Sequence, residues 1–327
     1  MEQLSIEKVK ESDFESLVQL YEDVWPDVDY DKRKKANFIV NESKGINYCA
    51  KRGNEVVGSR TSCPFNFYYG SRKLKTVQVG DSCVHPSCRG KGLFLKMNQA
   101  FLDEFFGNDN KGELIYNISV FASRKAYEKL GWKYIESLMS LRKFVNPIKT
   151  LFKLRFNLKR LSDSIIWDKQ HDEFTIDKRL LDSREDFLNH VDMLHVKYDE
   201  PTIKWRLKSQ SGIKLFKVDN LGCILYKIGH RGVLKEVEIG EVFLYEYTKQ
   251  NYKALLRALL KQCHPDIVKV LVSEGHPLKA WYKSSLFFRN PKQKYLHHGV
   301  RVETEEMKRI CYEPKNWAIS SLDIDTF

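Results

Sequence analysis

Hydrophobic and polar residues alternate along much of the chain in short runs, and segments with apolar residues three or four positions apart separate those runs. Alternation is typical of half-buried strands, and the wider spacing is typical of amphipathic helices. A capping box formed by Ser12 and Glu15 opens the first such helix. For the first half, the pattern predicts strands over 4–9, 47–52, 55–67, 77–84, 114–120 and 132–144, and helices over 14–21, 31–41, 92–106 and 123–130.

The second half of the chain repeats parts of the first. The strongest match is a strand pattern that reads VQVGDSCV in the first half and VEIGEVFL in the second, without a gap. Because three matches follow in the same order, we interpret the chain as a tandem duplication. The matched pairs are 13–14 with 186–187 at a helix start, 77–84 with 237–244 in a strand, and 126–129 with 280–283 in a short helix.

A basic segment separates the two halves. Residues 147–160 carry five basic residues and no acidic one. Such a segment suits a linker helix packed between domains or a helix lying on an acidic surface such as a membrane, and we favour the first as the commoner outcome. We therefore expect an N-terminal domain over 1–145, a linker helix over 146–165 and a second domain over 166–327.

The bulk composition fits a soluble protein of two domains, since 327 residues exceed one typical domain. No run of 18 apolar residues is present, and the N-terminus lacks the apolar core of a signal peptide, so we expect a cytoplasmic protein. The seven cysteines form no C-x-x-C pair and the histidines lack ligand spacing, so we expect no metal. A net charge of +12 indicates anionic partners without choosing among them.

The most informative stretch joins the predicted strand 77–84 to the predicted helix 92–106. Gly90 and Gly92 lie in the turn, and Arg89 and Lys91 flank them. Backbone N–H groups at a helix start, together with the helix dipole, suit a phosphate or pyrophosphate. A P-loop would need Ser or Thr after Lys91, and a dinucleotide loop would need glycine where Leu95 stands, so neither fits.

Two motifs resemble those of the GNAT acetyltransferases. Arg89 to Gly92 is similar to the family signature R-x-x-G-x-G/A, with Phe94 at the last position. Ser123, Tyr127 and Gly131 are similar to A/S-x-x-x-Y-x-K-x-G-F. The resemblance implies a mixed α/β fold in tandem, with a degenerate second copy, because residues 245–252 contain no glycine where the pyrophosphate loop would lie.

The resemblance also implies an acyl-CoA-dependent N-acyltransferase that uses acetyl-CoA. The strand before the loop is then expected to part from its neighbour, so that the pantetheine arm pairs with the free edge, and Tyr127 is expected to protonate the departing thiolate. The residues expected at the cofactor are Cys83, Val84, Arg89, Gly90, Lys91, Gly92, Leu93, Phe94 and Ser123.

The base that accepts the proton of the amine has two candidates. Asp81 precedes Val84 on the predicted strand, and its alternative role is structural, as the matching Glu241 suggests. The second candidate is the α-carboxylate of Phe327, since N-myristoyltransferases, which also contain two GNAT-like halves, use their terminus in this way. No His-Asp pair accompanies Cys83, so we expect no covalent acyl intermediate.

The acceptor that the resemblance favours is a small-molecule amine on an amino sugar, free or nucleotide-linked, because the ending 316–327 resembles two-domain GNAT proteins of bacterial surface polysaccharide synthesis. The alternative enzyme is a transferase with a peptide or aminoacyl acceptor. Because Phe94 departs from the family signature, a non-catalytic CoA-binding protein stays a further alternative. We expect no nucleic-acid partner and no stable membrane insertion, and a homodimer stays an open alternative.

Overall fold

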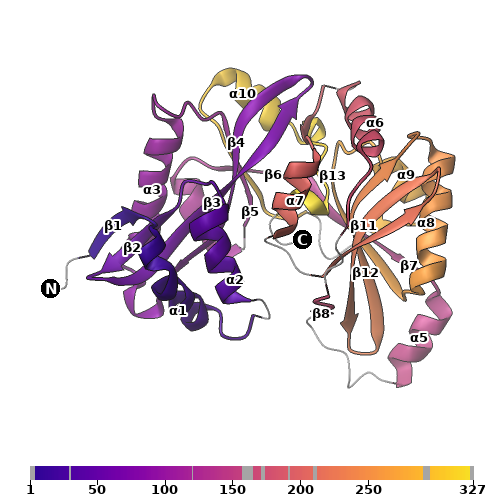
Figure 1. Cartoon of the computed structure of the whole chain (residues 1–327), viewed down its shortest axis with the longest axis horizontal. Coiled ribbons are helices and arrows are strands. Elements are labelled where there is room, and N and C mark those ends of the chain that lie inside the picture. Colours follow the sequence, from indigo (N-terminus) through magenta and orange to yellow (C-terminus); the bar gives the residue numbers. More distant parts are fainter. Residues whose placement is uncertain are drawn as a thin grey trace. The chain divides into compact units, whose positions relative to one another are not determined.

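The computed structural model describes residues 4–28, 31–119, 121–156, 165–170, 174–190, 192–208, 212–289 and 295–324. The chain forms two compact units (Figure 1). The first unit comprises residues 1–67, 73–135 and 297–313, and the second comprises residues 68–72, 136–296 and 314–327. No helix in the described part of the chain is both long and apolar enough to cross a membrane.

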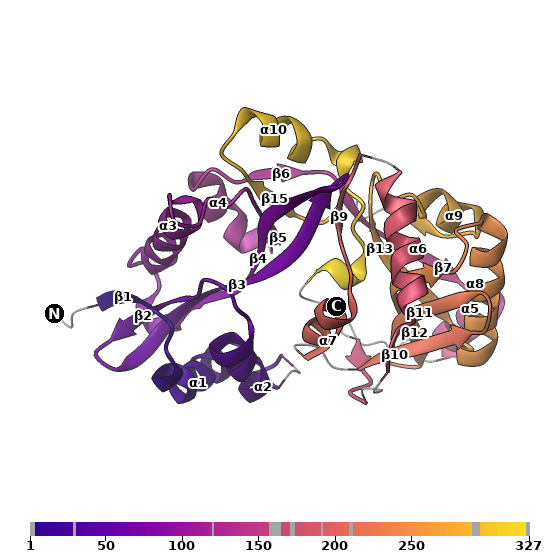
Figure 2. The same cartoon turned by 45° about the horizontal axis from the view of Figure 1, so that its top comes forward.

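The first unit is a mixed sheet with helices on both faces (Figure 2). The strands follow the order β1-β2-β3-β4-β5-β15-β6, and β4 and β5 are parallel. Helices α1 and α2 pack on one face and α3 and α4 on the other. The elements are β1 Leu4–Lys8, α1 Phe14–Val24, α2 Lys32–Asn37, β2 Tyr48–Arg52, β3 Glu55–Tyr69, β4 Arg72–Val84, α3 Leu93–Phe106, β5 Leu114–Ile118, α4 Phe121–Lys129, β6 Lys133–Ile135, β15 His298–Arg301 and α10 Glu305–Cys311.

The second unit has a sheet of the same kind. Its strands follow the order β10-β11-β12-β13-β7-β14, β8 pairs with β11, and α8 and α9 cover one face with an apolar core. The elements are β7 Leu138–Phe144, α5 Pro147–Phe156, β8 Ile166–Trp167, α6 Lys178–Asn189, β9 Leu194–Val196, α7 Glu200–Lys208, β10 Ile213–Val218, β11 Gly222–Arg231, β12 Leu234–Leu244, α8 Lys249–Cys263, β13 Ile267–Ser273, α9 Lys279–Ser284 and β14 Phe288–Arg289.

The two units do not follow the boundaries expected at residues 145 and 165. The single strand expected over 132–144 is two strands that belong to different sheets. β7 pairs along its whole length with β13 of the second sheet, whereas β15, far along the chain, pairs with β5 and β6 of the first. Each unit is therefore built from segments that lie far apart in the chain, which a linear reading of the sequence does not reveal.

The duplicated strand pattern corresponds to equivalent strands, β4 and β12. Each runs parallel to the next strand of its unit, β5 or β13, over only the first part of the match. Each is also irregular at the Gly-carboxylate pair: Asp81 has a φ of 46°, and the β11–β12 register shifts between Ile239 and Glu241. The match of 13–14 with 186–187 does not mark two helix starts, because α6 begins at Lys178 and residues 186–187 lie in its last turn.

Two further expectations differ from the structure. The linker segment forms α5, but its side chains Ile148, Leu151 and Phe152 are exposed instead of packed, and residues 157–164 lie outside the described part. The sequence also predicts a last strand over 317–322, which the structure reduces to isolated bridges at Trp317 and Ser320, followed by a 3₁₀ turn.

Candidate functional site

The glycine turn between β4 and α3 is open to ligands. Gly90 and Gly92 have φ values of 78° and 73°, where a side chain would be strained. A Cβ at either position would meet nothing within 4 Å, so the space beside the turn is free. Helix α3 starts after Gly92 without a side-chain cap, so its first N–H groups are available to an anion. These features fit a pyrophosphate, as the sequence predicts.

The basic residues of the turn are exposed beside it. Arg89 and Lys91 are solvent-exposed, and the Nε of Arg89 donates to the carbonyl oxygen of Val84 at 3.2 Å. Leu93 is buried under the turn together with Cys88, which anchors the start of α3 on the sheet. The side chain of Leu93 therefore holds the turn in place and leaves the backbone and the two cations to face a ligand.

Strands β4 and β5 part where the sequence predicts it. Their parallel pairing covers Thr76–Leu114 to Gln78–Tyr116, although β4 continues to Val84. A bulge redirects β4 at this point: Ser59 Oγ donates to the carbonyl of Asp81 at 3.1 Å, and the hydroxyl of Thr61 donates to the carbonyl of Gly80 at 2.7 Å. The free edges of the two strands suit an extended ligand that adds itself like a strand, as a pantetheine arm would.

Tyr127 lies beside the start of α3. Its ring is 3% exposed and packs edge-on against the ring of Phe94, with 5.2 Å between centroids. Ser123 lies one helical turn earlier on α4, so the two side chains share a face. In the described part of the chain, no group hydrogen-bonds to the Tyr127 hydroxyl, which leaves this hydroxyl free to donate. Phe94 therefore supports Tyr127 and leaves the glycine turn clear.

Asp81 faces the other side of the sheet. Its Oδ2 lies 2.6 Å from Nζ of Lys35 on α2, and its positive φ marks the bulge. The matching Glu241 is held in the same way, with its Oε2 2.8 Å from Nη2 of Arg184 on α6. Both carboxylates tie a bulged strand to a helix, which gives Asp81 a structural role whether or not it also accepts a proton.

Cys83 and Val84 point to opposite faces of β4. The thiol of Cys83 is buried against α1, and burial raises its pKa to about 12, so it stays protonated and unreactive. Val84 packs in the core cluster below α3. A ligand can therefore use the backbone of these two residues but not the sulfur. Phe327 lies outside the described residues.

Two buried polar residues near the parting strands escaped the sequence analysis. Arg60 on β3 is fully buried below α3, where its Nε donates to Oδ1 of Asn98 and its Nη2 has no partner among the described residues. Gln78, at the last β4–β5 pair, is 2% exposed, and neither atom of its amide is bonded within the described chain. Polar residues inside apolar strand patterns are the signal that could have found them.

Arg60 is linked to both Phe94 and Tyr127. Asn98, which accepts from Arg60, donates to the carbonyl of Phe94 at 2.8 Å. The guanidinium lies 4.3 Å from the centroid of the Phe101 ring, and Phe101 packs in the same core cluster as Tyr127. Burial lowers the pKa of Arg60 to about 10, and a charge on Tyr127 would act in the opposite direction. The residue is thus a buried cation that interacts electrostatically with Tyr127.

In the second unit, the chain itself fills the equivalent gap. The parallel pairing of β12 with β13 ends at Ile239–Val270, and residues 317–323 lie along the edge that β12 leaves. Ser273 N donates to the carbonyl of Ile319 at 2.9 Å, and Leu271 N donates to Oγ of Ser321 at 3.1 Å. Residues 317–319 are fully buried. A pantetheine arm therefore has no free edge there.

The N–H groups at the start of α8 in the second unit also have partners within the chain. Thr248 caps α8, and its Oγ1 accepts from Asn251 N at 3.2 Å. The Asn251 amide in turn donates to the carbonyl of Glu246 at 3.2 Å. The first-turn N–H groups that α3 leaves to a ligand are thus partly used by side chains in α8.

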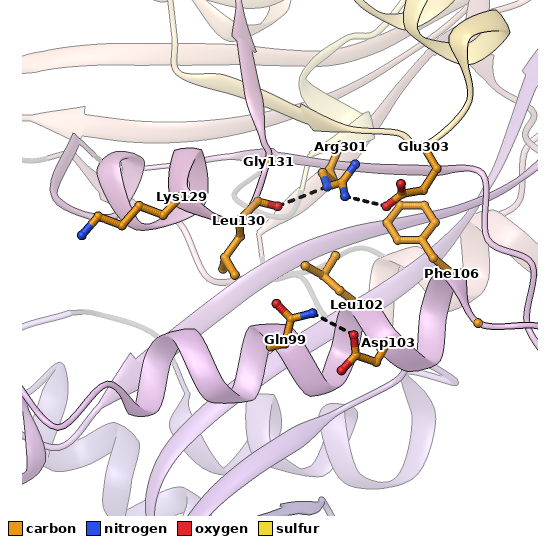
Figure 3. A pocket seen from close by; sticks show the side chains of 10 residues that line it. Gln99, Leu102, Asp103, Phe106, Lys129, Leu130, Gly131, Arg301 and Glu303 are labelled. Atoms are coloured by element: carbon orange, nitrogen blue, oxygen red, sulfur yellow. Dashed lines mark hydrogen bonds and ion pairs between the residues drawn. The ribbon is translucent and has the colours of Figure 1, made fainter.

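A pocket of about 510 Å³ lies at the other end of α3 (Figure 3). Arg301 spans it, with its Nε donating to the carbonyl of Leu130 at 3.2 Å and its Nη2 paired with Glu303. At about 1.5 Å per residue, the nearest lining residue of α3, Gln99, lies about 10 Å along the helix from Gly92. None of the predicted site residues lines this pocket.

The family of the first unit follows from comparison with known proteins. Residues 5–135 match the model of the GNAT acetyltransferase domain. This segment is a GNAT acetyltransferase domain. None of the curated proteins matches the chain. The glycine turn, the parted strands and Tyr127 of this domain are the features that the resemblance to the family implies.

Solved structures show that the fold extends over nearly the whole chain. A GCN5-related N-acetyltransferase from Anabaena variabilis is similar with a TM-score of 0.66 at 11% identity, over 92% of this chain and 73% of that one. One from Kribbella flavida gives 0.65 at 13%, over 92% and 71%. The Saccharomyces cerevisiae N-myristoyltransferase with bound myristoyl-CoA gives 0.56 at 11%, over 98% and 84%. The tandem GNAT fold is thereby confirmed.

One CoA site per chain is expected, because the second unit fills its own gap with residues 317–323 and caps α8 with Thr248. Titration calorimetry with acetyl-CoA should give a stoichiometry of one. Gly92→Val should then remove all binding, since the strained turn belongs to the first unit alone. A stoichiometry of two, or binding that survives in Gly92→Val, would contradict this.

Proposed function

We propose that the protein is an N-acetyltransferase that moves an acetyl group from acetyl-CoA to a primary amine. The observation that carries the proposal is the combination, in one GNAT domain, of an uncapped glycine turn, parted strands and a free tyrosine hydroxyl. Gly90 and Gly92 would receive the pyrophosphate with Arg89 and Lys91 beside it. The backbone of Cys83 and Val84 would pair with the pantetheine arm.

Acetyl-CoA supplies an activated acyl group whose leaving thiol has an ordinary pKa of about 8.5. The hydroxyl of Tyr127 carries the proton that the departing sulfur needs, and Phe94 fixes the ring that holds it. Backbone N–H groups at the β4 bulge can stabilise the developing oxyanion.

The acceptor that we propose is an amino sugar, free or nucleotide-linked. The net charge of +12 suits a phosphorylated acceptor, and the C-terminal sequence resembles two-domain GNAT proteins of polysaccharide synthesis. The orphaned amide of Gln78, at the parting of the strands, is suited to hydrogen-bond a neutral polar group such as a sugar hydroxyl. A peptide amine is the alternative acceptor.

Arg60 gives the transfer step electrostatic support. As Tyr127 releases its proton to sulfur, its oxygen gains negative charge, and the buried cation of Arg60 favours that charge. No carboxylate among the described residues neutralises the guanidinium. Such an uncompensated charge costs folding stability, so its presence beside the proposed site favours a role in activity.

Thiol release from acetyl-CoA, measured over amino sugars, nucleotide-linked amino sugars, amino acids, peptides and aminoglycosides, tests the proposed function. We expect turnover with an amino sugar, and Gly92→Val should abolish acetyl-CoA binding and turnover. Gly53→Val is the matched control, because Gly53 also has a positive φ, 59°, and open space around it but lies in the β2–β3 turn. Equal acetyl-CoA affinity in folded Gly92→Val would refute the site.

The base is tested by two variants. We propose the α-carboxylate of Phe327, because the carboxylate of Asp81 is already paired with Lys35. Two glycines added after Phe327 should lower kcat about 100-fold or more without changing the KM for acetyl-CoA. Asp81→Asn should act mainly on stability. A full kcat in the extended protein, together with a large loss in Asp81→Asn, would assign the base to Asp81 instead.

Arg60→Met should separate stability from activity. Removing the uncompensated buried charge is expected to leave the free energy of unfolding unchanged or to raise it by about 1–2 kcal/mol. The value of kcat should fall about tenfold, and the same change in a Tyr127→Phe background should have no further effect, because Arg60 acts through that tyrosine. Denaturant unfolding measures the free energy of unfolding, and a double-mutant cycle on kcat measures the coupling between Arg60 and Tyr127. Additive losses would show that Arg60 does not act through Tyr127.

A further inference from the structure

The second unit carries a surface that is both apolar and basic. It consists of two segments, 142–156 and 279–289, which hold β7 with α5 and α9 with β14. The segments are joined because β14 pairs with β7, and the rings of Phe144 and Phe288 lie 5.7 Å apart. We call this the α5 surface (Figure 1). None of its residues belongs to the proposed acetyl-transfer site.

Exposed apolar side chains of the described chain gather on the α5 surface. Nine large hydrophobic residues are exposed in the described part, and six of them lie here. Single exposed apolar residues are normal, but a contiguous group marks an interaction site. The six are Phe144, Ile148, Leu151, Phe152, Leu286 and Phe288.

The apolar stripe of α5 faces outward, although α5 is firmly attached. Ile148, Leu151 and Phe152 have the spacing of one helical face and are 70%, 64% and 59% exposed. The opposite face is tied to the unit: Thr150 is buried, and Nζ of Lys153 lies 2.6 Å from a carboxylate oxygen of Asp266. The ion pair and the buried threonine fix the inner face, so the outward stripe belongs to the attached helix.

The charge of the α5 surface has one sign. Its two segments contain eight basic residues and no acidic one, and two of the eight, Lys153 and Lys279, are paired with carboxylates outside the segments. Lys149, Arg155, Lys283 and Arg289 are exposed among the apolar side chains. A helix that presents Leu, Ile and Phe with interspersed Lys and Arg has the composition of one that lies in the interface of a bilayer. Basic residues of this kind are attracted to anionic lipid headgroups.

We propose that the α5 surface docks the protein on an anionic lipid bilayer, with the stripe of α5 and the neighbouring phenylalanines in the interface and the basic residues at the headgroups. A second copy of the chain is a poorer occupant, because its four exposed basic residues would face the same four like charges. Nucleic acid is poorer as well, because three of the six apolar residues are aliphatic and cannot stack on bases.

Co-sedimentation of the full chain with vesicles tests the proposal. The protein should bind vesicles that contain phosphatidylglycerol, bind pure phosphatidylcholine at least tenfold more weakly, and be released by salt. Leu151→Glu should weaken binding about tenfold or more, because an apolar side chain that would enter the bilayer is replaced by a charge of the lipid's own sign. Ile166→Glu is the matched control: Ile166 is 65% exposed in the same unit but lies outside the α5 surface.

Three results would overturn the proposal. They are no binding of the wild-type chain to anionic vesicles, an equal loss in Ile166→Glu, and a dimer seen by light scattering that Leu151→Glu dissociates. Circular dichroism shows whether each variant is folded. Calorimetry with acetyl-CoA runs in parallel, so that a failure of lipid binding is distinguished from a failure of the proposed transferase function.

Discussion

The separation of β4 from β5 is the constraint on which the rest of the first unit depends. Asp81 has a left-handed backbone conformation that interrupts the pleat, and the hydroxyls of Ser59 and Thr61 donate to the redirected carbonyl oxygens. Beyond Gln78 both strands keep a free edge, which a β-sheet normally avoids because unpaired backbone groups cost free energy. The helix that follows β4 begins without a cap at the same end. A ligand with an anionic head and an extended arm satisfies both needs at once.

The second unit has the same bulge and resolves it without a ligand. Glu241 is paired with Arg184, and residues 317–323 fill the edge beside β13. Tyr198 and Ser320 hold Asp323 at the end of this segment, and burial raises the pKa of Asp323 to about 6. A domain can thus keep this strand geometry without a ligand, provided that another part of the chain supplies the hydrogen bonds.

Three departures from ordinary folding rules stand out, and each has a functional interpretation. Arg60 is a buried cation with an unpartnered nitrogen within the described chain, Gln78 is a buried amide without partners there, and α5 turns its apolar stripe to solvent. Buried unpaired polar groups and exposed apolar patches both reduce stability or solubility. Their positions differ, since the first two lie beside the parting strands and the third lies on the surface of the second unit.

The sequence by itself determined the motifs of the cofactor turn, the identity of Tyr127 and the duplication of the strand pattern, because glycine spacing and periodicity act over a few neighbouring residues. Only the tertiary structure decided that β7 and β15 lie in different sheets from their sequence neighbours, that residues 317–323 fill the second gap, and that Arg60 is buried beside the core cluster that contains Tyr127. The tertiary structure also decided that the apolar stripe of α5 is exposed. Strand partners and burial depend on residues far apart in the chain, and their pairing leaves no local pattern.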